Sequence, residues 1–270
     1  MLLLINAFIG VFWWENKMTL NSYRSFCDDL YIETYINTEL DLPTGRDTIL
    51  AFFERIRRQY PSMSCMYQRG KKDFCLEEDR TQCQYRWVAL ETDRIGSGMV
   101  NPPDFESVFE QNRLVLELAP YMLSVSDLDI ESLDVTMAMD FDYTGNHDEV
   151  ITEALLSQSA FGSLLDLPGA RAVGCSPSFV ISLSGDDLTQ GRVSIESKTS
   201  VYGPKRKEQL IDEAISLSFT VRQYPPTTEA FDALKSFENQ CRLAKEIMAD
   251  KIVPNFILPL NETIALKRLT

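Results

Sequence analysis

The most constraining feature of the sequence is a strand pattern followed by a helix pattern, which occurs twice. In DLYIETYINTELD (residues 29–41), apolar and polar residues alternate, as they do in a strand with one buried face. Helical spacing of apolar residues follows at once, at Ile49, Phe52, Phe53 and Ile56. The pattern predicts a strand that packs one face against a helix.

The same order returns about 100 residues later. The apolar residues of this second alternating segment are Val135, Met137, Met139 and Phe141. A Thr-Gly pair follows the strand in both places, at 44–45 and at 144–145, and a helix pattern comes next. We therefore expect two related halves, at about 30–123 and 133–251, each with a strand, a helix and several antiparallel strands.

These patterns predict an α+β fold with duplicated strand-helix-antiparallel-strand units. The two halves are expected to form one large, mainly antiparallel sheet with helices on one face, which also hides sheet edges. The expected division is an apolar extension at 1–17, a first half at 18–125 and a second half at 126–270 with a long C-terminal helix. In this interpretation residues 93–103 (DRIGSGMVNPP) form a loop and residues 113–123 are extended.

The N-terminal segment MLLLINAFIGVFWW is apolar but short. A spanning helix needs about 20 apolar residues, and a secretion signal needs a basic residue before the apolar run and small residues after it. We expect a dispensable extension ahead of Met18, with two alternatives: a short element packed on the domain, or a true anchor or signal. The leading interpretation predicts a cytoplasmic protein without a membrane partner.

Six cysteines and one histidine limit the metal and redox chemistry. No C-x-x-C pair occurs, and the spacings of Cys65, Cys75 and Cys83 differ from the close pairs of structural zinc sites. Buried, reduced thiols are the favoured interpretation. His147 follows Thr-Gly-Asn at an expected helix start and is expected to face solvent, and Gly96-Ser97-Gly98 lacks the setting of a nucleophile elbow or phosphate loop. We expect no catalytic residue and no cofactor.

Acidic residues are concentrated in one part of the chain. The net charge is −14, and residues 100–170 hold fourteen Asp or Glu against one basic residue, Arg113. Solvated helix ends and strand edges also carry such residues, but a docking face for a protein with a basic surface is the sharper hypothesis. Its candidate residues are Asp127, Asp129, Glu131, Asp134, Asp140 and Asp142. The charge argues against a nucleic-acid partner, and homo-oligomerisation stays open.

A second hypothesis gives some of these carboxylates a metal. Glu39 and Asp41 close the first predicted strand, and Asp140 and Asp142 close its counterpart in the second half. If the halves are related by a pseudo-two-fold axis, the two pairs would meet and could hold Mg²⁺ or Ca²⁺. Such a site would suit a carboxylate-metal-dependent hydrolase or nuclease-like enzyme.

The C-terminal 90 residues carry a family resemblance. The segments GRVSIESKTSV and AISLSFTVRQYPPTTEAFDALKSFENQCRLAKEIMADKIVP are similar to the C-terminal half of an uncharacterised, sporadically distributed bacterial family of about this length. The resemblance implies two long strands, a helix and a bacterial origin. It transfers no functional residue.

Three functions remain for comparison with the structure. The leading one is a non-catalytic binding or scaffold protein that docks a partner through the acidic surface or the sheet face. The alternatives are the metal-dependent enzyme and a small-molecule binder with a pocket between helix and sheet.

Overall fold

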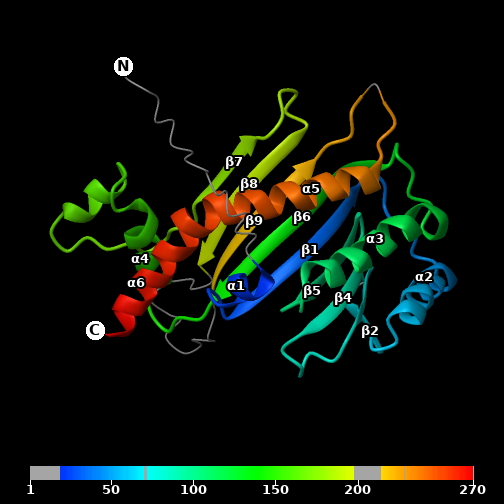
Figure 1. Ribbon diagram of the computed structural model, residues 1–270, viewed down its shortest axis with the longest axis horizontal. Helices are drawn as coiled ribbons and strands as arrows, with labels where there is room; N and C mark the ends of the chain where they lie inside the picture. Colours follow the sequence, from blue (N-terminus) through cyan, green and yellow to red (C-terminus); the bar gives the residue numbers. More distant parts are fainter. Residues whose placement is uncertain (1–18, 70–71, 198–213, 228, 270) are drawn as a thin grey trace, which may run out of the picture.

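The computed structural model describes residues 19–69, 72–197, 214–227 and 229–269 of the 270-residue chain. Its described strands form one antiparallel nine-stranded sheet in the order β2-β3-β4-β5-β1-β6-β9-β8-β7 (Figure 1). This confirms the predicted α+β fold. The strands are β1 (Asp29–Thr38), β2 (Cys65–Arg69), β3 (Asp73–Glu77), β4 (Tyr85–Leu90), β5 (Arg94–Val100), β6 (Ile130–Phe141), β7 (Ser178–Ser182), β8 (Thr189–Ser197) and β9 (Ile215–Gln223).

Helices cover one face of this sheet, and α3 and α5 lie across it (Figure 1). The covered face carries the apolar half of each alternating strand, such as Leu30, Ile32 and Ile36 of β1, which are buried in one continuous core. The helical segments are α1 (Leu20–Arg24), α2 (Arg46–Gln59), α3 (Phe105–Met122), α4 (His147–Ile151), η1 (Thr152–Leu156), η2 (Gly162–Asp166), α5 (Ala233–Ile247), η3 (Met248–Ile257) and α6 (Leu258–Arg268).

The two halves of the chain meet at the centre of the sheet, where β1 pairs with β6. The first half continues outward as β5, β4, β3 and β2, and the second as β9, β8 and β7. Each half runs from a central strand through a helical segment and antiparallel strands to a long helix. The first half has one more strand, β2. Descent of the two halves from one ancestor stays a prediction.

Two sequence-based assignments were wrong. Residues 94–100, expected in a loop, form strand β5 between β4 and β1. Residues 113–123, expected to be extended, belong to α3 and the residue that ends it. In both cases tertiary packing overrides a local pattern: β5 pairs on both sides, and Val115, Leu116 and Ala119 are buried at helical spacing.

A buried glutamine fixes each long helix to the sheet. The Nε2 of Gln111 in α3 donates to the carbonyl oxygens of Trp87 and Gly98, at 3.0 and 3.1 Å. The Nε2 of Gln240 in α5 donates to those of Leu133 and Val221, at 2.6 and 2.8 Å. These bonds connect each helix directly to the backbone of two neighbouring strands and satisfy the buried amide of each glutamine.

The C-terminal helix is longer than the predicted one. It continues from α5 through the π-helical η3, which contains Pro254, into α6. Within the part of the chain that the structure describes, no helix is both long and apolar enough to cross a bilayer. The predicted extension at 1–17 lies outside the described residues.

Candidate functional site

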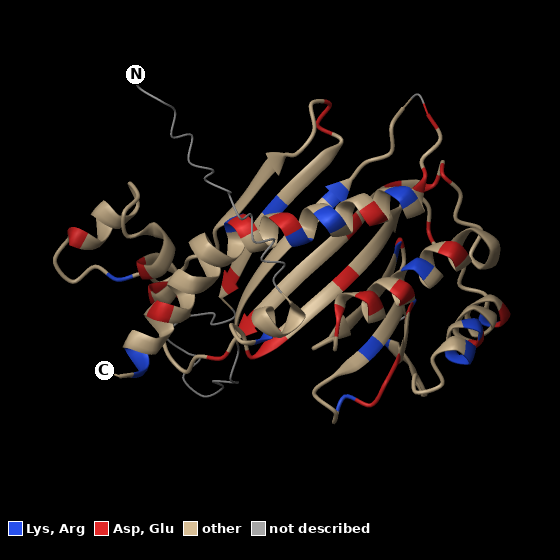
Figure 2. Ribbon diagram, in the orientation of Figure 1, with Lys and Arg blue, Asp and Glu red and all other residues tan. Residues whose placement is uncertain are grey.

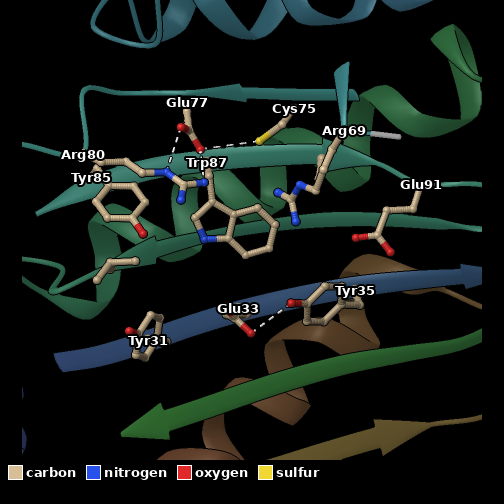
Figure 3. Close-up of a pocket in the computed structure, with 12 residues that line it drawn as sticks. Tyr31, Glu33, Tyr35, Arg69, Cys75, Glu77, Arg80, Tyr85, Trp87 and Glu91 are labelled. Carbon is tan, nitrogen blue, oxygen red and sulfur yellow. Dashed lines mark hydrogen bonds and ion pairs between the residues drawn. The ribbon is translucent and has the colours of Figure 1, made fainter. Parts of the chain in front are cut away.

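The face of the sheet opposite α3 and α5 carries a pocket, which we call the open-face pocket (Figure 3). Its volume is about 200 Å³, and strands β1 to β5 contribute to its lining. The lining residues used below are Tyr31, Glu33, Tyr35, Arg69, Glu77 and Trp87. The small-molecule hypothesis placed a pocket between helix and sheet, whereas this pocket lies on the uncovered side.

Strand alternation places these side chains together. In β1, even-numbered residues from Leu30 to Ile36 are buried beneath the helices, so Glu33 projects to the other face. The antiparallel register then aligns Glu33 of β1 with Gly98 of β5, Trp87 of β4 and Glu77 of β3 in one row across the sheet. The row across the pocket thus consists of residues that lie at least 10 positions apart in the chain.

Two glycines of β5 make room for the aromatic walls. A Cβ atom at Gly96 would lie 2.9 Å from both the Trp87 and the Tyr35 rings. At Gly98 it would lie 2.7 Å from the backbone oxygen of Ile32. Because neither position carries a side chain, Trp87 and Tyr35 lie with their ring centroids 6.0 Å apart across β5.

Glu77 is a buried carboxylate with a full set of partners. The residue is about 6% exposed, and its carboxylate receives hydrogen bonds from Nε and Nη2 of Arg80, at 2.8 and 2.7 Å. The Tyr67 hydroxyl donates to the same carboxylate at 3.1 Å. A buried carboxylate is tolerated where charge and hydrogen bonds compensate it in this way, so Glu77 and Arg80 form a rigid wall of the pocket.

A second ion pair lies at another side of the pocket. Arg94 donates from Nε to Glu91 at 3.0 Å, and its guanidinium lies 4.7 Å from the centroid of the Tyr35 ring. The pair orients the tyrosine ring through a cation–π contact. Glu91, like Glu77, therefore has its counter-charge within the protein.

Glu33 has no such counter-charge. The Tyr35 hydroxyl donates to Oε2 of Glu33 at 3.0 Å, and no basic group of the described residues forms an ion pair with this carboxylate. Burial raises the pKa of Glu33, and the Tyr35 hydrogen bond and the Arg94 charge oppose that shift only in part. Glu33 is a partly buried acid with free accepting capacity beside two aromatic rings.

Tyr31 joins the pocket to the second half of the molecule. Its hydroxyl donates to Oδ2 of Asp140 at 3.0 Å, and Ser216 of β9 donates to Oδ1 of the same residue. Burial, reinforced by Asp140, raises the pKa of Tyr31. Asp140 thus holds a pocket wall in place.

The six residues of the predicted acidic surface do not come together. Asp127, Asp129 and Glu131 lie at the start of β6, whereas Asp140 and Asp142 lie at its end, about 35 Å away for a strand of this length. Asp134 is buried between them and forms a two-pronged ion pair with Arg222, at 2.7 and 2.6 Å. Figure 2 shows acidic segments scattered over the ribbon. The structure does not support a convergent acidic docking face.

The predicted carboxylate metal site is also wrong. Because β1 and β6 are antiparallel, Asp140 pairs with Asp29 at the start of β1, whereas Glu39 and Asp41 follow its end. The two pairs are therefore separated by the length of β1, about 30 Å. Among the described residues, no group of three or more His, Cys, Asp or Glu side chains is placed to hold a metal ion.

The exposure of the single histidine was predicted wrongly, although its position at a helix start was not. His147 begins α4 and is buried, with Nε2 2.6 Å from the backbone oxygen of Tyr143, so it does not face solvent. The thiols differ among themselves: Cys75 and Cys241 are buried and Cys65 and Cys83 are exposed, all of them free. The expectation of uniformly buried thiols therefore holds only in part.

Beyond the pocket, strands β6, β9 and β8 carry paired hydroxyl groups on the open face. Thr136 and Thr220 share a hydrogen bond at 2.8 Å, and Ser194 and Ser218 share one at 2.9 Å. These pairs follow from the register of β6, β9 and β8. The open face is thus hollow and aromatic over β1 to β5, and it carries hydroxyl pairs over β6, β9 and β8.

No protein-family model matches the chain, and no characterised protein sequence matches it significantly. The class that the fold and the site define is an α+β protein with a single large antiparallel sheet and a polar, aromatic pocket on its uncovered face. The bacterial family resemblance of the C-terminal segment stays a prediction.

Proposed function

We propose that this chain is a non-catalytic binding protein that holds a small polar ligand in the open-face pocket. The observation that carries the proposal is a concave site whose aromatic walls and polar groups are already fixed. Trp87 and Tyr35 are placed over glycines, and Glu77 is held by Arg80 and Tyr67. Concave sites that combine aromatic walls with a few fixed polar groups are typical of ligand recognition.

The fixed pairs favour binding over proton transfer. Glu77 uses both oxygens on Arg80 and on Tyr67. A carboxylate held in this way supports shape and orientation, because a general acid or base must exchange its proton with a substrate. The hydrolase or nuclease hypothesis required a cluster of carboxylates, and the register of β1 and β6 keeps those carboxylates apart.

Docking of a protein partner on the open face is the second candidate function. The hydroxyl pairs of Thr136 with Thr220 and of Ser194 with Ser218 support it, since a hydroxyl group can both donate and accept a hydrogen bond. We place either function in the cytoplasm, which is consistent with free cysteines throughout the described residues.

Native mass spectrometry of the full chain, incubated with a small-molecule extract of its own cells, tests the proposal. We expect a bound species on the unmodified protein and its loss in Tyr85→Ala, which removes a half-buried pocket wall. Tyr121→Ala is the matched control, because Tyr121 is 89% exposed near the end of α3. Equal ligand retention by both variants would place the binding site elsewhere, and no bound species on any of them would remove the proposal.

A further inference from the structure

Two charged groups of the open-face pocket lack an opposite charge. Glu77 pairs with Arg80, and Glu91 pairs with Arg94. Glu33 accepts a hydrogen bond only from Tyr35, and Arg69 lies beside the neutral hydroxyl of Tyr67. Within the described residues neither of the two takes part in an ion pair, although both line the same cavity.

These two groups approach the pocket from different strands. Glu33 projects from β1 and Arg69 from the edge strand β2, with β5, β4 and β3 between them. Four strand steps of about 4.8 Å separate them across the sheet, and Arg69 lies four residues along β2 from Cys65, which belongs to the row of Glu33, so their backbones are about 23 Å apart. The side chains of both residues reach inward, and in Figure 3 they lie on different sides of the Trp87 ring. The space between the two charges is therefore the pocket itself.

We propose that the ligand of this pocket is a small zwitterion, an organic molecule that carries one ammonium group and one carboxylate. The ammonium group binds the carboxylate of Glu33, and the carboxylate binds the guanidinium of Arg69. This inference rests on the proposed function, because it names the class of ligand for the same site.

The surroundings of each charge suit this orientation. Around Glu33, the rings of Tyr31, Tyr35 and Trp87 offer π faces, which attract ammonium groups by cation–π contacts. Arg69 presents a planar fork that matches a carboxylate in two hydrogen bonds. A burial-raised pKa at Glu33 fits the same picture, because a bound cation would supply the missing counter-charge.

A ligand with a single charge satisfies the pocket less well. A simple amine would pair with Glu33 and leave the exposed guanidinium of Arg69 without an opposite charge. A simple carboxylate would leave Glu33 unpaired. Only a molecule with both charges, spaced to span the pocket, neutralises both groups at once.

Isothermal titration calorimetry with ω-amino acids of one to five methylene groups tests the inference. Alkylamines and alkylcarboxylates of matched length are the single-charge comparisons. We expect one chain length to bind best, and to bind about tenfold tighter than either comparison compound, because each charge-assisted pair contributes separately. The optimal length would also measure the spacing of the two charges.

Variants of the full chain assign the ends of the ligand. Glu33→Gln should weaken binding of the zwitterion and of the alkylamine about tenfold and leave binding of the alkylcarboxylate unchanged. Arg69→Gln should weaken binding of the zwitterion and of the alkylcarboxylate about tenfold and leave binding of the alkylamine unchanged. Glu131→Gln and Arg57→Gln, at exposed positions away from the pocket, are the matched controls. Thermal unfolding of each variant shows that it is folded, and Glu33→Asp and Arg69→Lys, which retain the charges, should recover part of the binding.

The results separate this inference from the proposed function. If the pocket binds a neutral compound and neither Glu33→Gln nor Arg69→Gln changes its affinity, the zwitterion is wrong and the binding function stands. Zwitterions that bind equally well to both variants would overturn the inference in the same way. If Tyr85→Ala also retains the bound species in the extract experiment, both the zwitterionic ligand and the binding function of the open-face pocket are wrong.

Discussion

At the scale of single residues, the pocket depends on glycine in β5, because a side chain there would fill the space that the pocket walls occupy. Gly98 faces the open side of β5, where a methyl group would come 2.7 Å from the backbone oxygen of Ile32 and 3.1 Å from the Trp87 ring. The backbone contact cannot be relieved by rotating a side chain, so β5 and β1 would have to separate. The glycine at this position therefore sets both the pairing of the strands and the depth of the pocket.

Gly98→Ala should lower the free energy of unfolding by roughly 1–3 kcal/mol, the usual cost of overpacking. Urea denaturation followed by circular dichroism measures this change. Gly185→Ala is the matched control, because no atom lies within 4 Å of the added methyl group, and it should stay within about 0.5 kcal/mol of the unmodified protein. Equal stability of the two variants would contradict the close approach at Gly98.

Glu33 makes the stability depend on pH in a defined direction. Burial raises its pKa in the folded state, so the folded protein retains a proton that the unfolded chain releases above a pKa of about 4.3. The contribution of Glu33 to stability then falls as the pH rises from that value through the folded pKa. The groups that act on it are Tyr35 and Arg94, which favour the charged form, and Asp140, which opposes it.

Glu33→Gln removes this dependence, because the amide cannot ionise and still accepts the Tyr35 hydrogen bond. We expect the variant to gain about 1 kcal/mol relative to the unmodified protein near neutral pH, and to lose that advantage near pH 4. Melting temperatures between pH 4 and pH 8 test the sign. A variant that is less stable at pH 8 than at pH 4, relative to the unmodified protein, would contradict it.

At the scale of elements, the sequence predicted those whose pattern is local. The alternating strands β1, β6 and β9 bury residues such as Ile32, Met137 and Phe219, and period-two spacing identifies them. Strand β5 has no such signal, because its open face consists largely of glycine. The candidate site was missed for this reason, because the pocket around Trp87 exists only where β5 joins β4 to β1.

The helices show the same limit. Residues 113–119 (RLVLELA) alternate well enough to resemble a strand. They are helical because they continue a helix that begins earlier, where the side chain of Asp104 caps the first turn. Gln111 could not be assigned a role from sequence, because its partners belong to β4 and β5. Polar core residues of this kind depend on long-range contacts, which a local pattern does not contain.

Gln240→Leu should be costly despite its similar size. It removes both hydrogen bonds from α5 to the Leu133 and Val221 oxygens, at a cost of roughly 0.5–1.5 kcal/mol for each bond. Arg242→Ala, on the exposed side of α5, loses a surface ion pair with Glu246 and an exposed hydrogen bond to Asn239, and should change the stability by less than about 1 kcal/mol. Chemical denaturation of both variants decides whether α5 is fixed through this amide.

At the scale of the whole molecule, the two halves share one folding unit. Strands β1 and β6 pair along almost their full lengths, from Asp29 with Asp140 to Thr38 with Ile130. The core that the helices cover is continuous on both sides of this pair. Separation of the halves would expose the longest strand edges of the sheet together with their apolar faces, whereas the outer edge strand β7 has only five residues.

We therefore expect the full chain to unfold in one cooperative transition, despite its two halves. Fragments 19–125 and 126–269 should not fold when expressed alone, because each presents an unpaired central strand to solvent, and they should regain the sheet only when expressed together. Calorimetry of the full chain and circular dichroism of the fragments are the measurements. Two calorimetric transitions, or a folded and monomeric 19–125 fragment, would show instead that the β1–β6 pair joins two independent domains.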